Sequence, residues 1–120
     1  MARPEFVQNG LKTILENISS LEQRFFEATP TRPRHSFTLE GGVEVTFAKE
    51  GYTRSGASNI HYSILFENVV TDVLNIHLRN PSTDDPTVNT RAVRIAIEYL
   101  LSTGSTILSR DVYVDKLLEA

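Results

Sequence analysis

The chain of 120 residues has no cysteine, no tryptophan and only 5 prolines. The missing cysteine excludes disulfides, thiolate metal sites and thiol nucleophiles. No apolar run approaches the ~18 residues that a membrane span needs, and the first residues lack the layout of a signal peptide. We therefore expect a cytoplasmic protein. The length is typical of one domain, so residues 1–120 are taken as a single domain.

The chain also has no strong excess of either charge: its formal net charge is -3, and no segment concentrates residues of one charge. A basic stripe for bulk nucleic acid is therefore absent from the pattern. The basic residues are unevenly divided, with nine arginines and three lysines among the 12. Arginine offers a planar fork that suits phosphate and carboxylate, whereas lysine offers a point charge. This excess favours recognition of a small anion.

The first 30 residues predict a long helix from about Pro4 to Glu27. Pro4 suits a first helical turn, and Ala28-Thr29-Pro30 ends the helix because a residue before proline leaves the α region. Apolar residues spaced four and three apart form one stripe, namely Val7, Leu11, Ile14, Ile18, Leu21 and Phe25. The stripe packs either on the sheet of its own chain or on a second copy across a two-fold axis. The second alternative predicts a homo-oligomer.

Alternating apolar residues then predict an antiparallel sheet. The expected strands are, in order, His35–Glu40, Val43–Ala48, Asn59–Glu67 and about Val70 to Arg79. Gly41-Gly42 is a two-residue hairpin signal, and residues 49–58 are expected to form a loop with two glycines. These strands give a four-stranded antiparallel meander with one face covered.

The last third predicts two helices. One runs from about Thr87 to Ser102, with Asp84-Asp85 before it as capping residues. The other is a short helix over Ser109–Glu119, with an edge strand at Val112–Val114 as the alternative. The fold class is therefore α+β: a long N-terminal helix, the four-stranded meander, and one long and one short C-terminal helix.

The sequence contains little that could carry out catalysis. No Gly-x-Ser-x-Gly elbow is present, and the glycines at 51 and 56 lack the Lys and Ser/Thr of a phosphate-binding loop. His61 and His77 are expected opposite each other on the polar face of adjacent strands. Two imidazoles without a third ligand do not make a metal site. We therefore expect no enzyme, no cofactor and no metal.

The arginines are the best indication of a binding site. Arg91 and Arg94 are three apart on the predicted helix and hence neighbours on its surface. Arg79 ends a strand, and Arg54 lies in the glycine loop. If the helix folds back over the sheet, these side chains line one edge of it. The alternative is that they form surface ion pairs, which contribute little to stability.

In its layout the chain resembles the phage-encoded Thoeris anti-defence sponges. The resemblance rests on the long first helix, the antiparallel sheet and the C-terminal helices. It implies an oligomeric protein that sequesters a signal of the cyclic ADP-ribose type. Ring, amide and arginine contacts to the ligand would come from Phe66, Asn75, Arg91 and Arg110. Together with Arg54, Arg79 and Arg94, these residues form the predicted ligand-binding site.

Two other readings stay open. The stretch from His35 to Phe66 is similar to the opening of type III secretion chaperones, although their mid-chain helix is missing between Ala48 and Asn59. An immunity or inhibitor protein that acts by surface complementarity is the third possibility. The sequence thus predicts a non-enzymatic protein that sequesters a small anionic, nucleotide-like ligand, with a protein–protein interaction module as the alternative.

Overall fold

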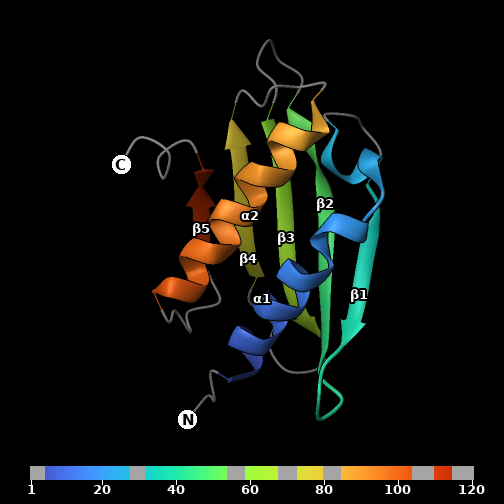
Figure 1. The fold of residues 1–120 in the computed structure, drawn as a ribbon, viewed down its shortest axis with the longest axis vertical. Coiled ribbons are helices and arrows are strands. Elements are labelled where there is room, and N and C mark those ends of the chain that lie inside the picture. Colours follow the sequence, from blue (N-terminus) through green and yellow to red (C-terminus); the bar gives the residue numbers. More distant parts are fainter. Residues whose placement is uncertain are drawn as a thin grey trace.

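The computed structural model describes residues 5–27, 32–53, 59–67, 73–79, 85–103 and 110–114. Two helices lie on one face of a five-stranded sheet, as Figure 1 shows. The predicted α+β class is confirmed in this arrangement. None of the helices in the described ranges is long and apolar enough to cross a membrane.

The elements follow one another in the order helix, strands, helix, strand. The helices are α1 (Glu5–Asn17), the 3-10 helices η1 (Ile18–Ser20) and η2 (Gln23–Phe26), and α2 (Pro86–Ser102). The strands are β1 (Arg34–Thr38), β2 (Glu44–Thr53), β3 (Asn59–Glu67), β4 (Val73–Arg79) and β5 (Arg110–Tyr113).

The strands lie side by side in the order β1-β2-β3-β4-β5. The first four pair antiparallel, as expected of a meander. The pair β4–β5 is parallel, and α2 lies between these two strands in the chain. A parallel pair needs such a crossover because a tight hairpin can join only antiparallel strands.

The predicted four-stranded sheet is therefore corrected to five strands, and the predicted helix over Ser109–Glu119 is wrong at Arg110–Tyr113, which form β5. Val114 is helical, and residues 115–119 lie outside the described ranges. The alternative to the predicted helix, an edge strand, is the observed structure. Val112 and Val114 are 4% and 2% exposed, whereas Asp111 and Tyr113 are exposed. This alternation has the period of a strand, and pairing with β4 satisfies backbone groups that β4 would otherwise leave open.

The first helix is shorter than predicted, because α1 ends at Asn17 instead of Glu27. Leu21 and Glu22 adopt extended backbone, with ψ of 151° and 146°, and separate η1 from η2. The break turns the adjacent side chains of Phe25 and Phe26 into the core, where both are at most 2% exposed.

The apolar stripe of this segment is buried inside its own chain. Val7, Leu11 and Ile14 are at most 2% exposed and belong to the single core between the helices and the sheet. The first of the two predicted alternatives is therefore the observed one. The homo-oligomer stays a prediction, and it now needs a surface other than this stripe.

The hairpin between β1 and β2 forms at the predicted glycines. Gly41 and Gly42 have φ of 90° and 86°, a region that glycine enters without strain. The second strand is longer than predicted, because β2 continues from Ala48 to Thr53. A bulge between Lys49 and Gly51 shifts the register there, and the expected loop is described only up to residue 53.

Side chains from three elements hold η2 in place. The Tyr62 hydroxyl donates to the Phe25 carbonyl at 2.6 Å, and the Asn89 amide donates to the Phe26 carbonyl at 2.8 Å. The buried Lys49 ammonium donates to the carbonyls of Arg24 and Glu27. These donors replace hydrogen bonds that a continuing α-helix would have made, which explains why η2 need not be α-helical.

Replacing Tyr62 by phenylalanine is expected to destabilise the protein by about 1–2 kcal/mol, because the buried carbonyl of Phe25 loses its donor. Burial raises the pKa of Tyr62, which agrees with a hydroxyl that stays protonated. Thermal unfolding followed by circular dichroism should show a Tm lowered by roughly 5 °C. Tyr113→Phe is the control, since this side chain is 40% exposed. Equal effects of the two substitutions would contradict the assigned role.

Candidate functional site

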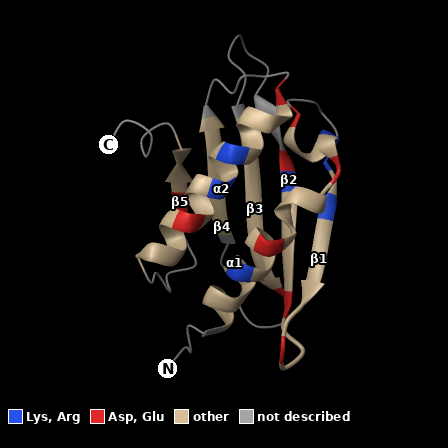
Figure 2. Cartoon of the chain, in the orientation of Figure 1, with Lys and Arg blue, Asp and Glu red and all other residues tan. Residues whose placement is uncertain are grey.

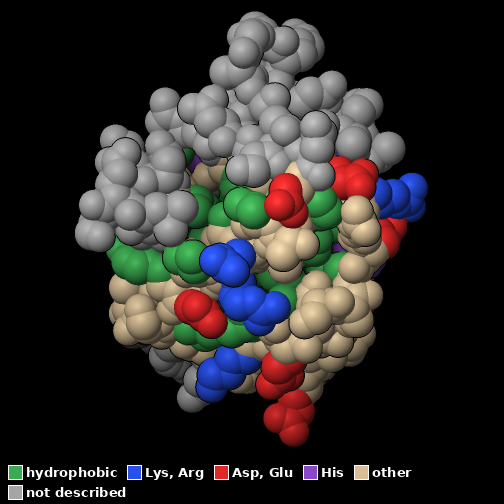
Figure 3. All heavy atoms as spheres, turned by 45° about the horizontal axis from the view of Figure 1, so that its top comes forward, with side chains coloured by type: hydrophobic (Ala, Val, Ile, Leu, Met, Phe, Trp, Pro, Cys, Tyr) green, Lys and Arg blue, Asp and Glu red, His purple; other side chains and the backbone are tan. Residues whose placement is uncertain are grey.

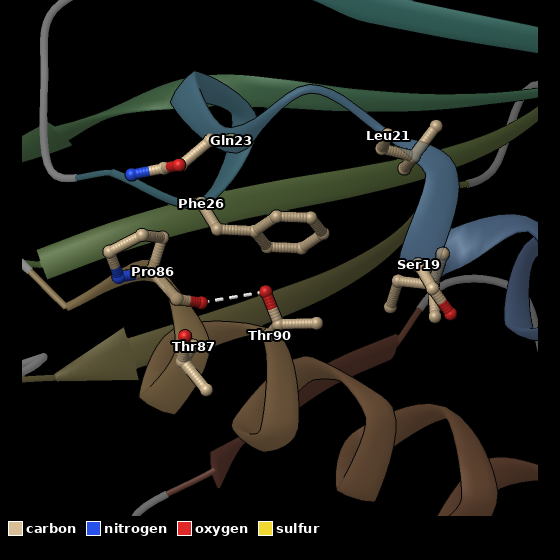
Figure 4. Close-up of a pocket in the computed structure, with 8 residues that line it drawn as sticks. Ser19, Leu21, Gln23, Phe26, Pro86, Thr87 and Thr90 are labelled. Carbon is tan, nitrogen blue, oxygen red and sulfur yellow. Dashed lines mark hydrogen bonds between the residues drawn. The ribbon is translucent and has the colours of Figure 1, made fainter.

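A cavity of about 290 Å³ lies between the first turns of α2 and the segment that contains η1 and η2. Its size is near the lower end for small-molecule sites, ~300–1,000 Å³. Figure 4 shows the side chains that surround it. The lining residues are Ile18, Ser19, Leu21, Gln23, Phe26, Pro86, Thr87 and Thr90.

The lining combines flat apolar groups with uncharged hydrogen-bonding groups. The Phe26 ring and Pro86 form one part of the wall, and Gln23 comes from η2 on the side of Pro86 (Figure 4). The Thr90 hydroxyl donates to the Pro86 carbonyl at 2.6 Å, so its oxygen can still accept a bond. None of the lining residues that the structure describes carries a charged side chain. The cavity therefore suits a neutral group with polar edges.

Both walls of the cavity are held by hydrogen bonds. One wall is η2, which the donors from Tyr62 and Asn89 fix to the sheet and to α2. The other is the start of α2, where the Asp85 side chain accepts from the Thr87 amide at 3.0 Å. Asp85 therefore caps the helix as predicted, while Asp84 lies outside the described residues. A cavity with fixed walls loses little entropy when a ligand binds.

Arg91 and Arg94 lie one turn of α2 beyond the threonines that line the cavity. Thr87 and Arg91 are four residues apart, as are Thr90 and Arg94, so each pair shares a side of the helix. Helical side chains lean towards the N-terminus of their helix, which here is the end that carries the cavity. Both arginines therefore lean towards the cavity.

Neither arginine belongs to an ion pair in the described part of the chain. The four ion pairs found there involve Arg24, Arg34, His35 and His77 as the basic partners. Figure 2 marks the basic positions on α1 and α2, and Figure 3 shows blue side chains gathered over the helix-covered face. The basic residues of these helices are Lys12, Arg91 and Arg94. Among the described side chains, the surface-pair alternative is thus not observed at Arg91 and Arg94.

Phe66, the predicted stacking ring, is fully buried. Its ring lies beneath α1, with the Phe6 ring edge-on at a centroid distance of 5.3 Å. A ring in this position has no free face for a ligand. Its position among the apolar, even-numbered residues of β3 already indicated this burial.

Asn75 lies on the opposite face of the sheet from α2. Its side-chain oxygen accepts from the Ser63 hydroxyl at 3.1 Å and lies 2.8 Å from Nε2 of His61. The sheet itself separates Asn75 from Arg91 and Arg94. One site that contains all three residues is therefore not what the structure shows.

The other three predicted arginines cannot be placed fully. Arg54 lies outside the described residues. Arg79 pairs with Asn59 in the sheet, and Arg110 pairs with Leu74, but their side chains are outside the description. Of the seven predicted ligand residues, the structure brings Arg91 and Arg94 together.

The cavity residues were not predicted as a site. Leu21 was predicted as a member of the apolar stripe of one continuous helix, and Phe26 as a residue of the same helix that widens this stripe. The two adjacent phenylalanines at 25 and 26 were the only local signal, because both cannot lie at the centre of one helical stripe. Polar lining residues such as Ser19 and Thr90 carry no signal without the tertiary structure.

His61 and His77 lie opposite each other, as the alternation predicts. Their rings are stacked at a centroid distance of 4.7 Å, and the Tyr113 ring stacks on His77 at 4.5 Å. Nε2 of His77 lies 2.9 Å from the Asp111 carboxylate, and this hydrogen bond lowers the pKa of Asp111. Among the described residues, no three His, Cys, Asp or Glu side chains are grouped to hold a metal.

Chemically, the helix-covered face offers a binding arrangement: a neutral cavity with two cationic side chains beside it. Hydroxyl groups line the cavity, and guanidinium groups supply donors that suit an oxyanion. Compared with protein-family models, curated proteins and solved structures, the chain finds no match.

Proposed function

We propose that the protein binds and sequesters a small anionic, nucleotide-like ligand without transforming it. A neutral ring of the ligand occupies the cavity, and its anionic group is held by Arg91 and Arg94. The observation that carries the proposal is the position of these two arginines, outside every described ion pair and one helical turn from the cavity.

The cavity suits one ring of such a ligand. A volume of about 290 Å³ lies near the lower end of the range for small-molecule sites, ~300–1,000 Å³, so the cavity has room for part of a nucleotide rather than for the whole of it. Phe26 and Pro86 offer flat apolar contact, while Gln23 and the threonines can bond polar ring edges. Larger parts of a nucleotide would extend out of the cavity along α2.

The arginine pair suits the anionic group. Guanidinium groups bond phosphate oxygens in pairs, and such charge-assisted bonds are stronger than neutral ones. Two arginines three apart on a helix can reach the same phosphate. Because Arg91 is exposed and Arg94 half-buried, the bound anion would lie at the mouth of the cavity rather than inside it.

The alternative function is a protein–protein interaction module. A large exposed apolar patch would favour it. In the described ranges the large exposed hydrophobic residues are Val88 and Tyr113, which lie on α2 and on β5. Among the described residues these are two separate side chains, and the cavity with its neighbouring arginines favours the small-ligand function.

Isothermal titration calorimetry against AMP, GMP, cyclic AMP, ADP-ribose and cyclic ADP-ribose tests the proposal. The last two are included because of the resemblance to the Thoeris anti-defence sponges. We expect saturable heat with at least one compound, and weaker binding of the matching nucleoside without phosphate. If none of the nucleotides binds, the proposal fails. Light scattering on the same samples tests the predicted homo-oligomer.

Replacing Ser19 by tryptophan should strongly weaken the binding of any nucleotide found by this titration. Ser19 is exposed and lines the cavity, so an indole at this position fills the space that the ring needs. Ser20→Trp is the matched control, because Ser20 is also exposed but is not among the lining residues. Calorimetry should give a Kd raised at least about tenfold for Ser19→Trp, the loss of one good ring contact or more. Similar Kd values for the two variants would exclude the cavity as the binding site.

A further inference from the structure

The outer edge of β1 carries backbone groups without a partner. β1 lies at one end of the strand order, with β2 on one side and no described strand on the other (Figure 1). The Lys49 amide donates to the Pro33 carbonyl, so the odd-numbered positions of β1 direct their backbone groups towards β2. The outward N–H and C=O groups belong to Arg34, Ser36 and Thr38. No hydrogen bond in the described part of the chain uses these groups.

This edge is regular and accessible. Proteins often protect an edge strand with a bulge or with a proline that removes an outward donor. The pairing of β1 with β2 runs from Arg34 to Thr38 without a shift in register. Pro33 lacks an N–H group, but this position points towards β2, so the outer edge keeps its three donors. Because Arg34, Ser36 and Thr38 are all exposed, a further strand can reach the edge.

The edge is complementary to a second copy of itself. β1 has five residues, and the central one, Ser36, is one of the outward positions. When two copies pair antiparallel about Ser36, Arg34 of each copy lies opposite Thr38 of the other. All the outward positions then form hydrogen-bonded pairs, which gives about six N–H···O=C bonds across the contact. Any other register pairs at least one of these positions with a residue outside β1.

Charge at the two ends of β1 favours the same pairing. Figure 2 shows basic positions towards the start of β1 and acidic positions beyond its end, near the hairpin. The residues are Arg32 and Arg34 at the start, and Glu40, Glu44 and Glu67 at the other end. Antiparallel pairing places the basic end of one copy beside the acidic end of the other, with Arg32 opposite Glu40 of the second copy.

Glu44 and Glu67 need a cation beside them. They lie opposite each other on β2 and β3, and neither belongs to an ion pair among the described side chains. Like charges in this position destabilise a pair of strands. Both residues alternate with buried core residues, so they lie on the face of the sheet opposite α1 and α2, which we call the open face.

Arg34 of a second copy supplies this cation. Arg34 lies on the open face, because it alternates with His35, whose ring packs on a buried phenylalanine. Within its own chain it approaches Glu50 at 3.9 Å, too long for a hydrogen bond, and its side chain is 53% exposed. In the pairing about Ser36, the Cα atoms of Arg34 and of Glu44 in the other copy are two strand spacings apart, about 10 Å. Two extended side chains can bridge this distance over the short Thr38.

We propose that the protein forms a homodimer in which β1 pairs antiparallel with β1 of a second copy about Ser36. The two five-stranded sheets then become one continuous sheet. Both copies use the same edge, so the assembly closes at two chains. This edge is the surface that the predicted homo-oligomer needs, since the stripe of α1 is buried. The contact is independent of the proposed ligand site, because no residue that lines the cavity belongs to β1.

Single cysteines test the register directly, because the chain has no cysteine of its own. In the proposed dimer residue 36 faces its own copy with Cα atoms about 5.5 Å apart, a separation that suits a disulfide. The two copies of residue 38 lie about 14 Å apart along the strands. Oxidation by diamide should therefore crosslink Ser36→Cys at least about tenfold faster than Thr38→Cys, as seen on non-reducing gels. Equal rates for the two variants would overturn the proposal.

Light scattering over a range of concentrations tests the dimer itself. We expect twice the chain mass of 13.5 kDa. Ser36→Pro removes an outward N–H but no bond to β2, so this variant should be monomeric. Ser36→Ala keeps the N–H and is the control for the lost contact of the hydroxyl with Thr46. An unchanged chain that stays monomeric up to about 1 mM would overturn the proposal and leave the edge to a strand of another protein.

A charge exchange decides if Ser36→Pro does not fold. Arg34→Glu should weaken the dimer about tenfold or more, because two symmetry-related attractions become repulsions. Adding Glu44→Arg to this variant should restore the dimer, since the exchanged charges again attract across the contact. Circular dichroism checks that each variant is folded. A dimer that Arg34→Glu leaves unchanged, or that the second substitution does not restore, would contradict the proposed contact.

Discussion

Replacing Gly10 by alanine is expected to destabilise the protein by about 2 kcal/mol, although alanine is the better helix former by ~1 kcal/mol. A Cβ atom at this position would lie 2.4 Å and 2.8 Å from two ring carbons of Phe66 and 3.4 Å from a methyl group of Val45. Phe66 and Val45 are fully buried, so the ring has little room to move. Overpacking of a core typically costs ~1–3 kcal/mol, and here it must exceed the gain in helix propensity.

Asn9→Ala gives the matched control in the same turn of α1. Asn9 is exposed, so alanine there should stabilise the protein by about 0.5 kcal/mol through helix propensity alone. Urea unfolding of both variants measures the two effects. The expected result is opposite signs. A stabilised Gly10→Ala variant would show that α1 does not rest directly on Phe66.

Replacing both Arg91 and Arg94 by alanine should weaken binding of an identified nucleotide by about 100-fold or more. Each charge-assisted hydrogen bond is worth ~1.5–3 kcal/mol, and the pair supplies the cationic contacts in the proposed site. Because neither residue belongs to an ion pair or to the buried core in the described structure, Tm should remain nearly unchanged. Calorimetry gives the Kd, and thermal unfolding gives the Tm.

Arg34→Ala controls for the loss of positive charge in general, because Arg34 lies on the open face of the sheet. It should change the Kd less than about threefold, as expected of a distant exposed charge. The single variants Arg91→Ala and Arg94→Ala should each lose part of the affinity. If the double variant binds as tightly as the unchanged protein, the arginines are not the anion site.

Patterns along the chain were sufficient to predict much of the fold. Alternation predicted the four strands of the meander, and the glycine pair predicted the turn between β1 and β2. The expected start of α2 at Thr87 differs by one residue from the observed start at Pro86. Each of these features depends on neighbours in sequence, which is why local periodicity is informative about them.

Features that depend on distant partners were missed. The strand β5 forms because Val112 can reach the core once β5 pairs with β4, and a segment of four residues does not show this by itself. Likewise, η2 depends on donors from Lys49, Tyr62 and Asn89, which are 22 to 63 residues away from their acceptors. Although the apolar stripe predicts one continuous helix, these tertiary hydrogen bonds stabilise a separate 3-10 helix instead.

The candidate site was predictable only in part. Helical spacing predicted that Arg91 and Arg94 are neighbours, because this prediction needs no knowledge of the rest of the fold. Strand alternation already assigned Phe66 to the apolar face and Asn75 to the polar face, so the two could not belong to one site with the arginines. The cavity could not be anticipated, because it forms where the start of α2 meets the break between η1 and η2.

Chemical-shift mapping by amide NMR during a nucleotide titration tests the central claim most directly. The probe is the nucleotide that binds most tightly by calorimetry. We predict the largest shifts at residues around the cavity and along α2, among them Ser19, Thr90 and Arg94, with little change at Asn75 and His77. Shifts confined to the open face of the sheet, or no shifts at saturating concentrations, would contradict the account.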